Sequence, residues 1–223
     1  MQNILRFDRA RNCVRYLIKK FKIEEMYIPY YLCDVIRHTL FEEGCKPLFY
    51  HIDDDFLPVQ KFPEDSYILY PNYFGVFGEN VDKLAEIYPK LIADNAHAFF
   101  DEPKGFACFN SGVKFGLGEN AYLMFGKNLP EQKDYEDLKE KLNTNFLNFH
   151  QKYSSINLLK INTDRKKYPF CYPLLVSTTK EADEIVKKLE KQGYIIYRYW
   201  NNLPVNFNEY KFYSRLIPIT VAR

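Results

Sequence analysis

The sequence predicts an α/β protein, with a large unit built on a mainly parallel sheet and a small α+β unit after it. Strand-like and helix-like segments alternate through residues 9–125, as is typical of parallel strands joined by crossover helices. A long polar and charged segment then begins near residue 127 and separates this alternation from the rest. The length of 223 residues is enough for one large core or two small ones.

Apolar spacing and helix-ending residues predict the elements of the large unit. Residues 9–21 carry apolar side chains at helical spacing, and a second helix over residues 35–43 ends at Gly44. A third helix over residues 80–88 has Asn80 as its candidate N-cap. Strands are expected at residues 26–31, 47–52, 66–74, 90–93, 107–110 and 121–125, with an acidic loop at residues 53–55.

The second half predicts a helix followed by a smaller mixed unit. The helix is amphipathic, covers residues 129–152 and has Pro130 near its start. A further helix over residues 179–192 has Thr178 or Thr179 as its N-cap and ends at Gly193. Strands are expected at residues 156–161, 170–177 and 194–200. We therefore expect three parts: a large domain (1–127), a helical connector (128–155) and a small α+β domain (156–223).

Composition excludes several classes of protein. Hydrophobic residues make up 47% and charged residues 27% of the chain, which is ordinary for a globular protein. The net charge of +2 gives no field that would recruit nucleic acid or an anionic membrane. We expect no membrane span and no signal peptide, because no apolar run is long enough. Five scattered cysteines without a CxxC pair favour reduced thiols and a cytoplasmic location.

No metal site is expected from the histidines. His38, His51, His97 and His150 show no spacing typical of ligands to a transition metal. His51 with the acidic loop at residues 53–55 is either a divalent-ion site or a solvated loop, and the solvated loop is favoured. Aromatic residues are abundant at 17%, and most should belong to the core. A subset could line a pocket for a sugar nucleotide: Tyr30, Tyr31, Tyr73 and Tyr199.

Asp94 and Lys114 are the main candidates for chemistry. Asp94 directly follows an expected strand, and Lys114 lies in the turn-like segment after the next one. Ligands of α/β sheets gather at these strand ends, so the two side chains should meet there. A lysine that forms a Schiff base and an acid that keeps a ring nitrogen protonated are what pyridoxal phosphate requires, and Ser111 could contact its phosphate. The pattern alone also fits a helix-capping aspartate and a solvated lysine.

These residues lie in motifs that resemble the DegT/DnrJ/StrS family, the pyridoxal-phosphate-dependent sugar aminotransferases of fold type I. Asp94–Ala98 is similar to the family signature D-x-A-[HQ]-A, and Ser111–Lys114 is similar to S-x-x-K. Supporting resemblance covers nearly the whole chain, in the family's order. It is carried by Pro29–Asp34, Pro71–Gly75, Gly118–Ala121, Tyr172–Leu175, Tyr199–Asn202 and Leu216–Ile219.

The resemblance implies a fold-type-I large domain and amino transfer from an amino acid, with glutamate expected, to a nucleotide-linked keto-sugar. It implies that Lys114 binds pyridoxal phosphate covalently and Asp94 meets its ring nitrogen. His97 would lie near the ring and Ser111 on the phosphate. Tyr31 is the expected ring-stacking residue, although the family offset also allows Cys33. A homodimer is implied, because the family builds each active site from two chains.

The sequence departs from the family pattern at the phosphate. Where members have a Gly/Ser/Thr-rich turn, this chain reads Asp8–Asn12, so Arg9 or Arg11 would replace the backbone contacts. The residue-level interpretation keeps two alternatives open. One is a catalytically inactive binding or assembly protein with the aminotransferase fold. The other is a nucleotide-sugar dehydratase or isomerase, which ranks lower because the chain has no G-x-G-x-x-G loop.

Overall fold

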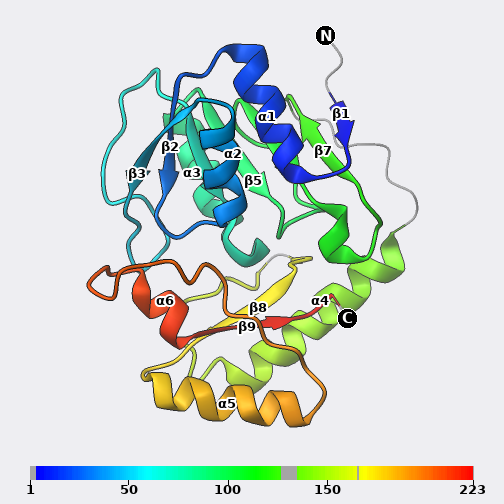
Figure 1. The fold of residues 1–223 in the computed structure, drawn as a ribbon. Coiled ribbons are helices and arrows are strands. Elements are labelled where there is room, and N and C mark those ends of the chain that lie inside the picture. The colour runs from blue at the N-terminus through cyan, green and yellow to red at the C-terminus, as the bar shows by residue number, and fades with distance from the viewer. Residues whose placement is uncertain (1–3, 127–134, 165, 223) are drawn as a thin grey trace.

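A mixed sheet of seven strands forms the upper half of the molecule in Figure 1, a computed structural model that describes residues 4–126, 135–164 and 166–222. Strands β2 to β6 run parallel, whereas β7 is antiparallel to both β6 and β1. Their order across the sheet is β1-β7-β6-β5-β4-β2-β3. The mainly parallel sheet predicted from the sequence is therefore confirmed. The strands are β1 (Ile4–Phe7), β2 (Glu25–Pro29), β3 (Lys46–Tyr50), β4 (Ile68–Pro71), β5 (Leu91–Asn95), β6 (Ala107–Asn110) and β7 (Ala121–Met124).

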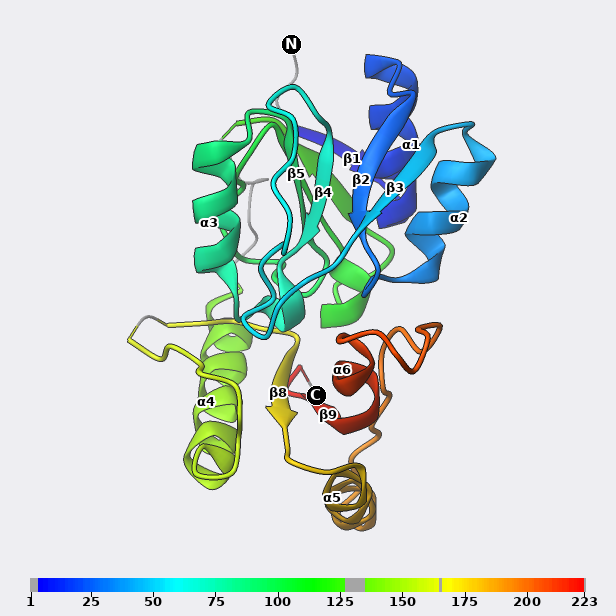
Figure 2. The same cartoon turned by 90° about the vertical axis from the view of Figure 1, so that its left-hand side faces the viewer.

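Helices cover both faces of this sheet, as Figure 2 shows. Helices α1 (Ala10–Phe21) and α2 (Asp34–Glu42) lie on one side, and α3 (Gly78–Ile87) lies on the other. The central strands are apolar on both faces as a result. In β4, Leu69 packs into the core under α1 and α2, while its neighbours Ile68 and Tyr70 pack into the core on the opposite face.

The C-terminal part has a small sheet with its own helices, drawn below the large sheet in Figure 1. Strands β8 (Cys171–Leu175) and β9 (Leu216–Thr220) pair antiparallel. Helix α4 (Glu136–Tyr153) packs on β8, and helices α5 (Thr179–Lys191) and α6 (Tyr210–Arg215) pack on β9. The division of the chain into three domains stays a prediction, and the expected boundary at residues 127 and 128 lies outside the described residues.

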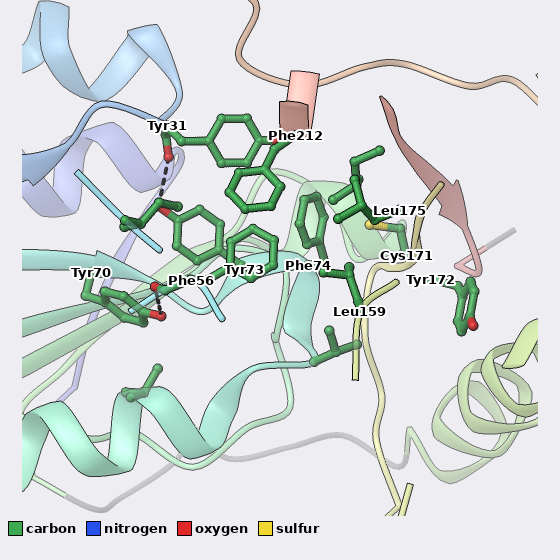
Figure 3. Packing of buried hydrophobic residues seen from close by; sticks show 14 of the residues in the cluster. Tyr31, Phe56, Tyr70, Tyr73, Phe74, Leu159, Cys171, Tyr172, Leu175 and Phe212 are labelled. Atoms are coloured by element: carbon green, nitrogen blue, oxygen red, sulfur yellow. Dashed lines mark hydrogen bonds between the residues drawn. The ribbon is translucent and has the colours of Figure 1, made fainter. Parts of the chain in front are cut away.

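A shared aromatic core joins the small sheet to the large one (Figure 3). The Phe212 ring of α6 stacks on Phe56, with centroids 4.4 Å apart, and lies 5.5 Å from the ring of Tyr31. Buried tyrosine hydroxyls satisfy backbone carbonyls there: Tyr73 donates to Tyr31 O at 2.9 Å and Tyr70 to Phe56 O at 2.8 Å. Much of the aromatic surplus therefore holds the two parts of the chain together.

Two expected strands are absent. Residues 156–161 form a loop because the Asn157 side chain, rather than a backbone ladder, ties them to β8. Its Oδ1 accepts from Leu159 N and Leu175 N, and its Nδ2 donates to Pro173 O. Residues 194–200 are also irregular, and none of the strands in the described ranges pairs with them. Conversely, β1 and α6 were not predicted, since each is short and depends on contacts with distant segments.

Helix ends test the capping predictions. Thr178 caps α5 as expected, since its side chain accepts from Glu181 N at 3.1 Å. Asn80 as an N-cap is wrong, because α3 begins at Gly78. The buried Asn80 amide instead donates to Asp55 O at 2.7 Å. The predicted start of the long helix at residues 129 and 130 lies outside the described residues, and α4 is described from Glu136.

Within the described ranges, none of the helices combines the length and the apolar character that crossing a membrane requires. All five cysteines are free thiols.

Candidate functional site

A cavity of about 380 Å³ opens where β4, β5 and β6 end. This is the edge at which side chains from neighbouring parallel strands converge, and the volume is in the range of small-molecule sites. The cavity brings together four of the five predicted site residues, which are Asp94, His97, Ser111 and Lys114. The remaining lining residues are Arg9, Ala10, Arg11, Cys33, Val35, Ile36, Pro71, Asn72, Ala96, Phe109, Tyr199 and Trp200.

Asp94 supplies a carboxyl group from the end of β5. Its Oδ1 accepts a hydrogen bond from the Ala96 amide at 2.9 Å, which fixes the orientation of the side chain. Burial raises the pKa of Asp94 from 3.8 to about 6, while the Ala96 amide and the charge of Lys114 act in the opposite direction. A cation that enters the cavity would therefore stabilise the ionised form of this carboxyl group.

Lys114 supplies the amine from the short helix after β6 (η2, Gly112–Phe115). Its Nζ lies 5.3 Å from the centre of the Phe170 ring and 5.9 Å from that of Tyr199, so aromatic faces surround the nitrogen. The segment that carries Lys114 is closed on itself, because Gly112 N donates to Asn120 O at 2.7 Å. A lysine held in this way is confined to one corner of the cavity.

His97 is buried beside these two groups. Burial lowers the pKa of the His97 imidazole well below its usual value, and the charge of Lys114 adds to the effect, so the ring is neutral. The Trp200 indole lies parallel to it, at 10° and 5.9 Å between centroids. Phe170 and Tyr199 contact it from other sides, each at 5.3 Å. A neutral imidazole has one N–H donor and one acceptor nitrogen to offer.

The corner near the start of α1 is suited to an anion. Arg9 and Arg11 line the cavity here, together with the Ser111 side chain. The N-cap residue Arg9 makes no side-chain cap hydrogen bond, and the first turn of α1 has no acidic residue, so the start of the helix offers backbone N–H groups to an anion. The carboxylate of Asp8, just before the helix, accepts a hydrogen bond from the Asn12 side chain. Arg9 forms an ion pair with Glu119, which ties the start of the helix to the segment that carries Lys114.

The structure does not bring Tyr31 to the cavity. The side chain is fully buried, with its ring edge-on to Trp200 at 4.5 Å and parallel to Tyr73 at 5.8 Å. Cys33, the alternative that the family offset allowed, does line the cavity. Burial raises the pKa of its thiol, so the neutral thiol presents a small apolar surface there. Sequence reasoning also missed Asn72, which lines the cavity from within the Pro71–Gly75 motif.

The acidic loop at residues 53–55 is occupied by contacts within the protein. Asp53 Oδ1 accepts from the amides of Asp55 and Leu57, and Asp54 pairs with Lys211. His51 Nδ1 contacts the buried Glu209 carboxylate at 2.9 Å instead of the loop. In the ranges that the structure describes, no group of three or more His, Cys, Asp or Glu side chains is arranged to hold a metal ion.

Sequence comparisons give no relative. No protein-family model matches the chain, and no curated protein matches it either.

Structural comparison finds proteins with a similar fold. A DegT/DnrJ/EryC1/StrS aminotransferase from Brucella abortus is similar with a TM-score of 0.73 at 10% identity, over 98% of this chain and 80% of that one. PseC of Helicobacter pylori, an aminotransferase of pseudoaminic acid biosynthesis, has a TM-score of 0.65 at 16% identity, over 97% of this chain and 81% of that one. The apo form of a protein from Streptococcus pneumoniae assigned as a sugar aminotransferase has a TM-score of 0.71 at 14% identity, over 98% of this chain and 81% of that one. Its PLP and PMP forms each give 0.67.

The chain therefore has the fold of the pyridoxal-phosphate-dependent transferases of fold type I. Within that class, its fold is that of the DegT-type sugar aminotransferases, as the motifs around Asp94 and Lys114 led us to expect.

Proposed function

We propose that this protein is a pyridoxal-phosphate-dependent aminotransferase that moves an amino group from an amino acid, with glutamate expected, to a nucleotide-linked keto-sugar. The observation that carries the proposal is the presence of Asp94 and Lys114 in one cavity of a DegT-type fold. The similar proteins from Brucella abortus and Helicobacter pylori are aminotransferases, and the one from Streptococcus pneumoniae has PLP and PMP forms.

The residues of the cavity fit the cofactor group by group. The Asp94 carboxylate would meet the ring nitrogen, and the Lys114 amine would hold the aldehyde carbon. Arg9, Arg11, Ser111 and the uncapped start of α1 would hold the phosphate, which matches their charge and donors. Cys33 and Ala96 present small side chains to the same cavity and would leave room for a flat ring.

Each of these residues has a distinct task in the proposed reaction. When bound, the cofactor supplies an electron sink for the carbon atom that loses its proton during transfer. Lys114 Nζ, which borders the cavity beside the Phe170 and Tyr199 rings, would accept that proton and return it. Asp94 keeps the ring nitrogen protonated, and its buried carboxylate is stabilised by that cation. The neutral His97 can donate one hydrogen bond to an oxygen on the ring.

The visible absorption of the purified protein tests this proposal. We expect the protein with added pyridoxal phosphate to turn yellow, to lose that band on borohydride treatment and to lose it on addition of glutamate. Lys114→Ala should be colourless. Lys188→Ala is the matched control, because Lys188 lies exposed on α5, and it should behave as the unaltered protein. A protein that cannot be loaded would overturn the proposal in favour of the non-catalytic binding or assembly alternative.

Three further features belong to the same proposal. The first is a homodimer, to be measured by light scattering, and the second is a location in the cytoplasm. The third is a division into a large domain, a helical connector and a small domain. The separate clusters of helices around the two sheets support this division. Limited proteolysis should cut between these parts rather than within them.

A further inference from the structure

Tyr199 and Trp200 form one wall of the cavity and belong to the C-terminal part of the chain. They end the irregular segment of residues 194–200 and reach the strand ends of the large sheet, where they line the cavity with Lys114 and His97. Both residues are partly buried and border the cavity. Their centroids lie 5.8 Å apart and their planes are tilted by 40°, so the two rings form adjacent, angled parts of one aromatic wall.

Trp200 is held in an unusual backbone conformation. Its φ of 58° lies in the left-handed region, which bulky side chains seldom adopt. Close ring contacts maintain it: Tyr31 packs edge-on at 4.5 Å, and His97 packs parallel at 5.9 Å. Strained backbone of this kind concentrates at ligand-binding positions, where the surrounding packing fixes a side chain in one orientation.

The cavity is divided by chemistry into a charged side and an aromatic side. Arg9, Arg11 and Asp94 come from the large sheet and its first helix, and the proposed cofactor uses them. Tyr199 and Trp200, which form the aromatic wall, have no role in holding the proposed cofactor. The aromatic wall meets the charged side at Lys114, whose Nζ lies 5.9 Å from the centre of the Tyr199 ring. A molecule that receives a nitrogen atom beside Lys114 must therefore contact this wall.

We propose that Tyr199 and Trp200 bind the sugar ring of the acceptor and select it against the smaller amino acid. The inference rests on the proposed function and deepens it. A pyranose ring presents C–H groups on its faces and hydroxyl groups on its rim. Its face therefore stacks on an aromatic surface without leaving buried hydroxyls unpaired. A flexible amino-acid donor has no such face and gains little from the wall.

The chain provides its own probe of this wall, because Trp200 is its single tryptophan. Tryptophan fluorescence, excited at a wavelength that the 19 tyrosines do not absorb, therefore reports on the surroundings of Trp200. We would titrate the loaded protein with UDP-, dTDP- and GDP-linked hexoses, and with the free nucleotides as controls. A hexose stacked on the indole should shift the emission beyond the change that its free nucleotide causes. If no member of the panel does so, the inference is overturned.

Variants separate recognition of the sugar from a merely structural role. Affinity for the best hexose probe, measured by calorimetry, should fall about tenfold in Trp200→Leu or Tyr199→Leu and stay within about threefold in Trp200→Phe. Because Tyr199 and Trp200 also contact Lys114 and His97, the rate at which glutamate removes the yellow band is measured in the same variants, and it should fall by less than the hexose affinity in both leucine variants. Tyr197→Leu is the matched control, because Tyr197 belongs to the same segment but is 63% exposed and does not line the cavity.

Two failures can be told apart. An equal loss for hexose and glutamate, or no loss for either, contradicts sugar binding by the wall while the yellow band still supports the aminotransferase. A colourless protein contradicts the proposed function itself.

Discussion

Gly75 and His97 meet backbone to backbone: a Cβ atom on Gly75 would lie 2.1 Å from the carbonyl oxygen of His97. Gly75 also has a φ of +77°, so both its conformation and its surroundings require glycine. The same His97 carbonyl accepts a hydrogen bond from Phe170 N at 2.9 Å. The turn after β4, the loop after β5 and the start of β8 are thus fixed against one another beside the candidate site.

We predict that Gly75→Ala lowers the free energy of unfolding much more than Gly44→Ala. Gly44 has a similar φ of +70°, but no atom lies within 4 Å of its added Cβ. Gly44→Ala should therefore cost only the strain of a non-glycine residue in the left-handed conformation, about 1–2 kcal/mol. Gly75→Ala adds displacement of His97 and should cost at least about 3 kcal/mol. Urea unfolding measures both values, and equal losses would contradict the close contact.

We predict that Asp94→Asn stabilises the protein without cofactor at neutral pH. The folded pKa of Asp94 is raised from 3.8 to about 6, so the stability that its protonated form contributes is present below about pH 4. That stability is lost as the pH rises through about 6. Asparagine mimics the protonated form at every pH. The free energy of unfolding of Asp94→Asn, measured in urea, should therefore exceed that of the unaltered protein by near zero at about pH 4 and by about 3 kcal/mol at pH 7.5.

Asp101 provides the control for this experiment. Burial also raises its pKa to about 6, but Asp101 lies outside the candidate cavity, beside the Nδ2 group of Asn72. Asp101→Asn should show the same pH-dependent gain in stability and still bind pyridoxal phosphate. Asp94→Asn should bind it weakly. Equal binding by the two variants would contradict the role proposed for Asp94.

We predict that Glu119→Gln strengthens binding of pyridoxal phosphate by up to about fivefold, because Glu119 competes with the phosphate for Arg9. Arg9→Gln should weaken the same binding. Pyridoxal without its phosphate is the matched ligand, and its affinity should not change in either variant. Calorimetry at low and high salt measures these effects, and a gain for both ligands would mean that Glu119 acts elsewhere.

Local patterns were enough to predict the sheet and the presence of Asp94 and Lys114 in one cavity. Asp94 lies at the end of β5, and Lys114 lies in the short helix that follows β6. These neighbouring strands are parallel, so their ends meet at one edge of the sheet, and the apolar runs that predict them are enough to predict that the two side chains meet. Thr178 as a helix cap depends likewise on its near neighbours.

Packing between distant segments determines which side chains line the cavity and which segments form strands, and local sequence patterns do not show this packing. Tyr31 and Cys33 lie two residues apart, and only the docking of Phe212 and Trp200 buries the tyrosine ring and leaves the cysteine at the cavity. Residues 194–200 have the composition of a strand, but their rings pack on the site instead of joining a sheet. A four-residue strand such as β1 exists only because β7 pairs with it.

The central claim is that Lys114 binds the cofactor, and peptide mapping tests it most directly. The protein is loaded with pyridoxal phosphate, reduced with borohydride, digested and analysed by mass spectrometry. We predict one modified lysine, Lys114, and no modification in parallel samples that receive no pyridoxal phosphate or are not reduced. Label spread over exposed lysines such as Lys188, with Lys114 unmodified, would contradict the account.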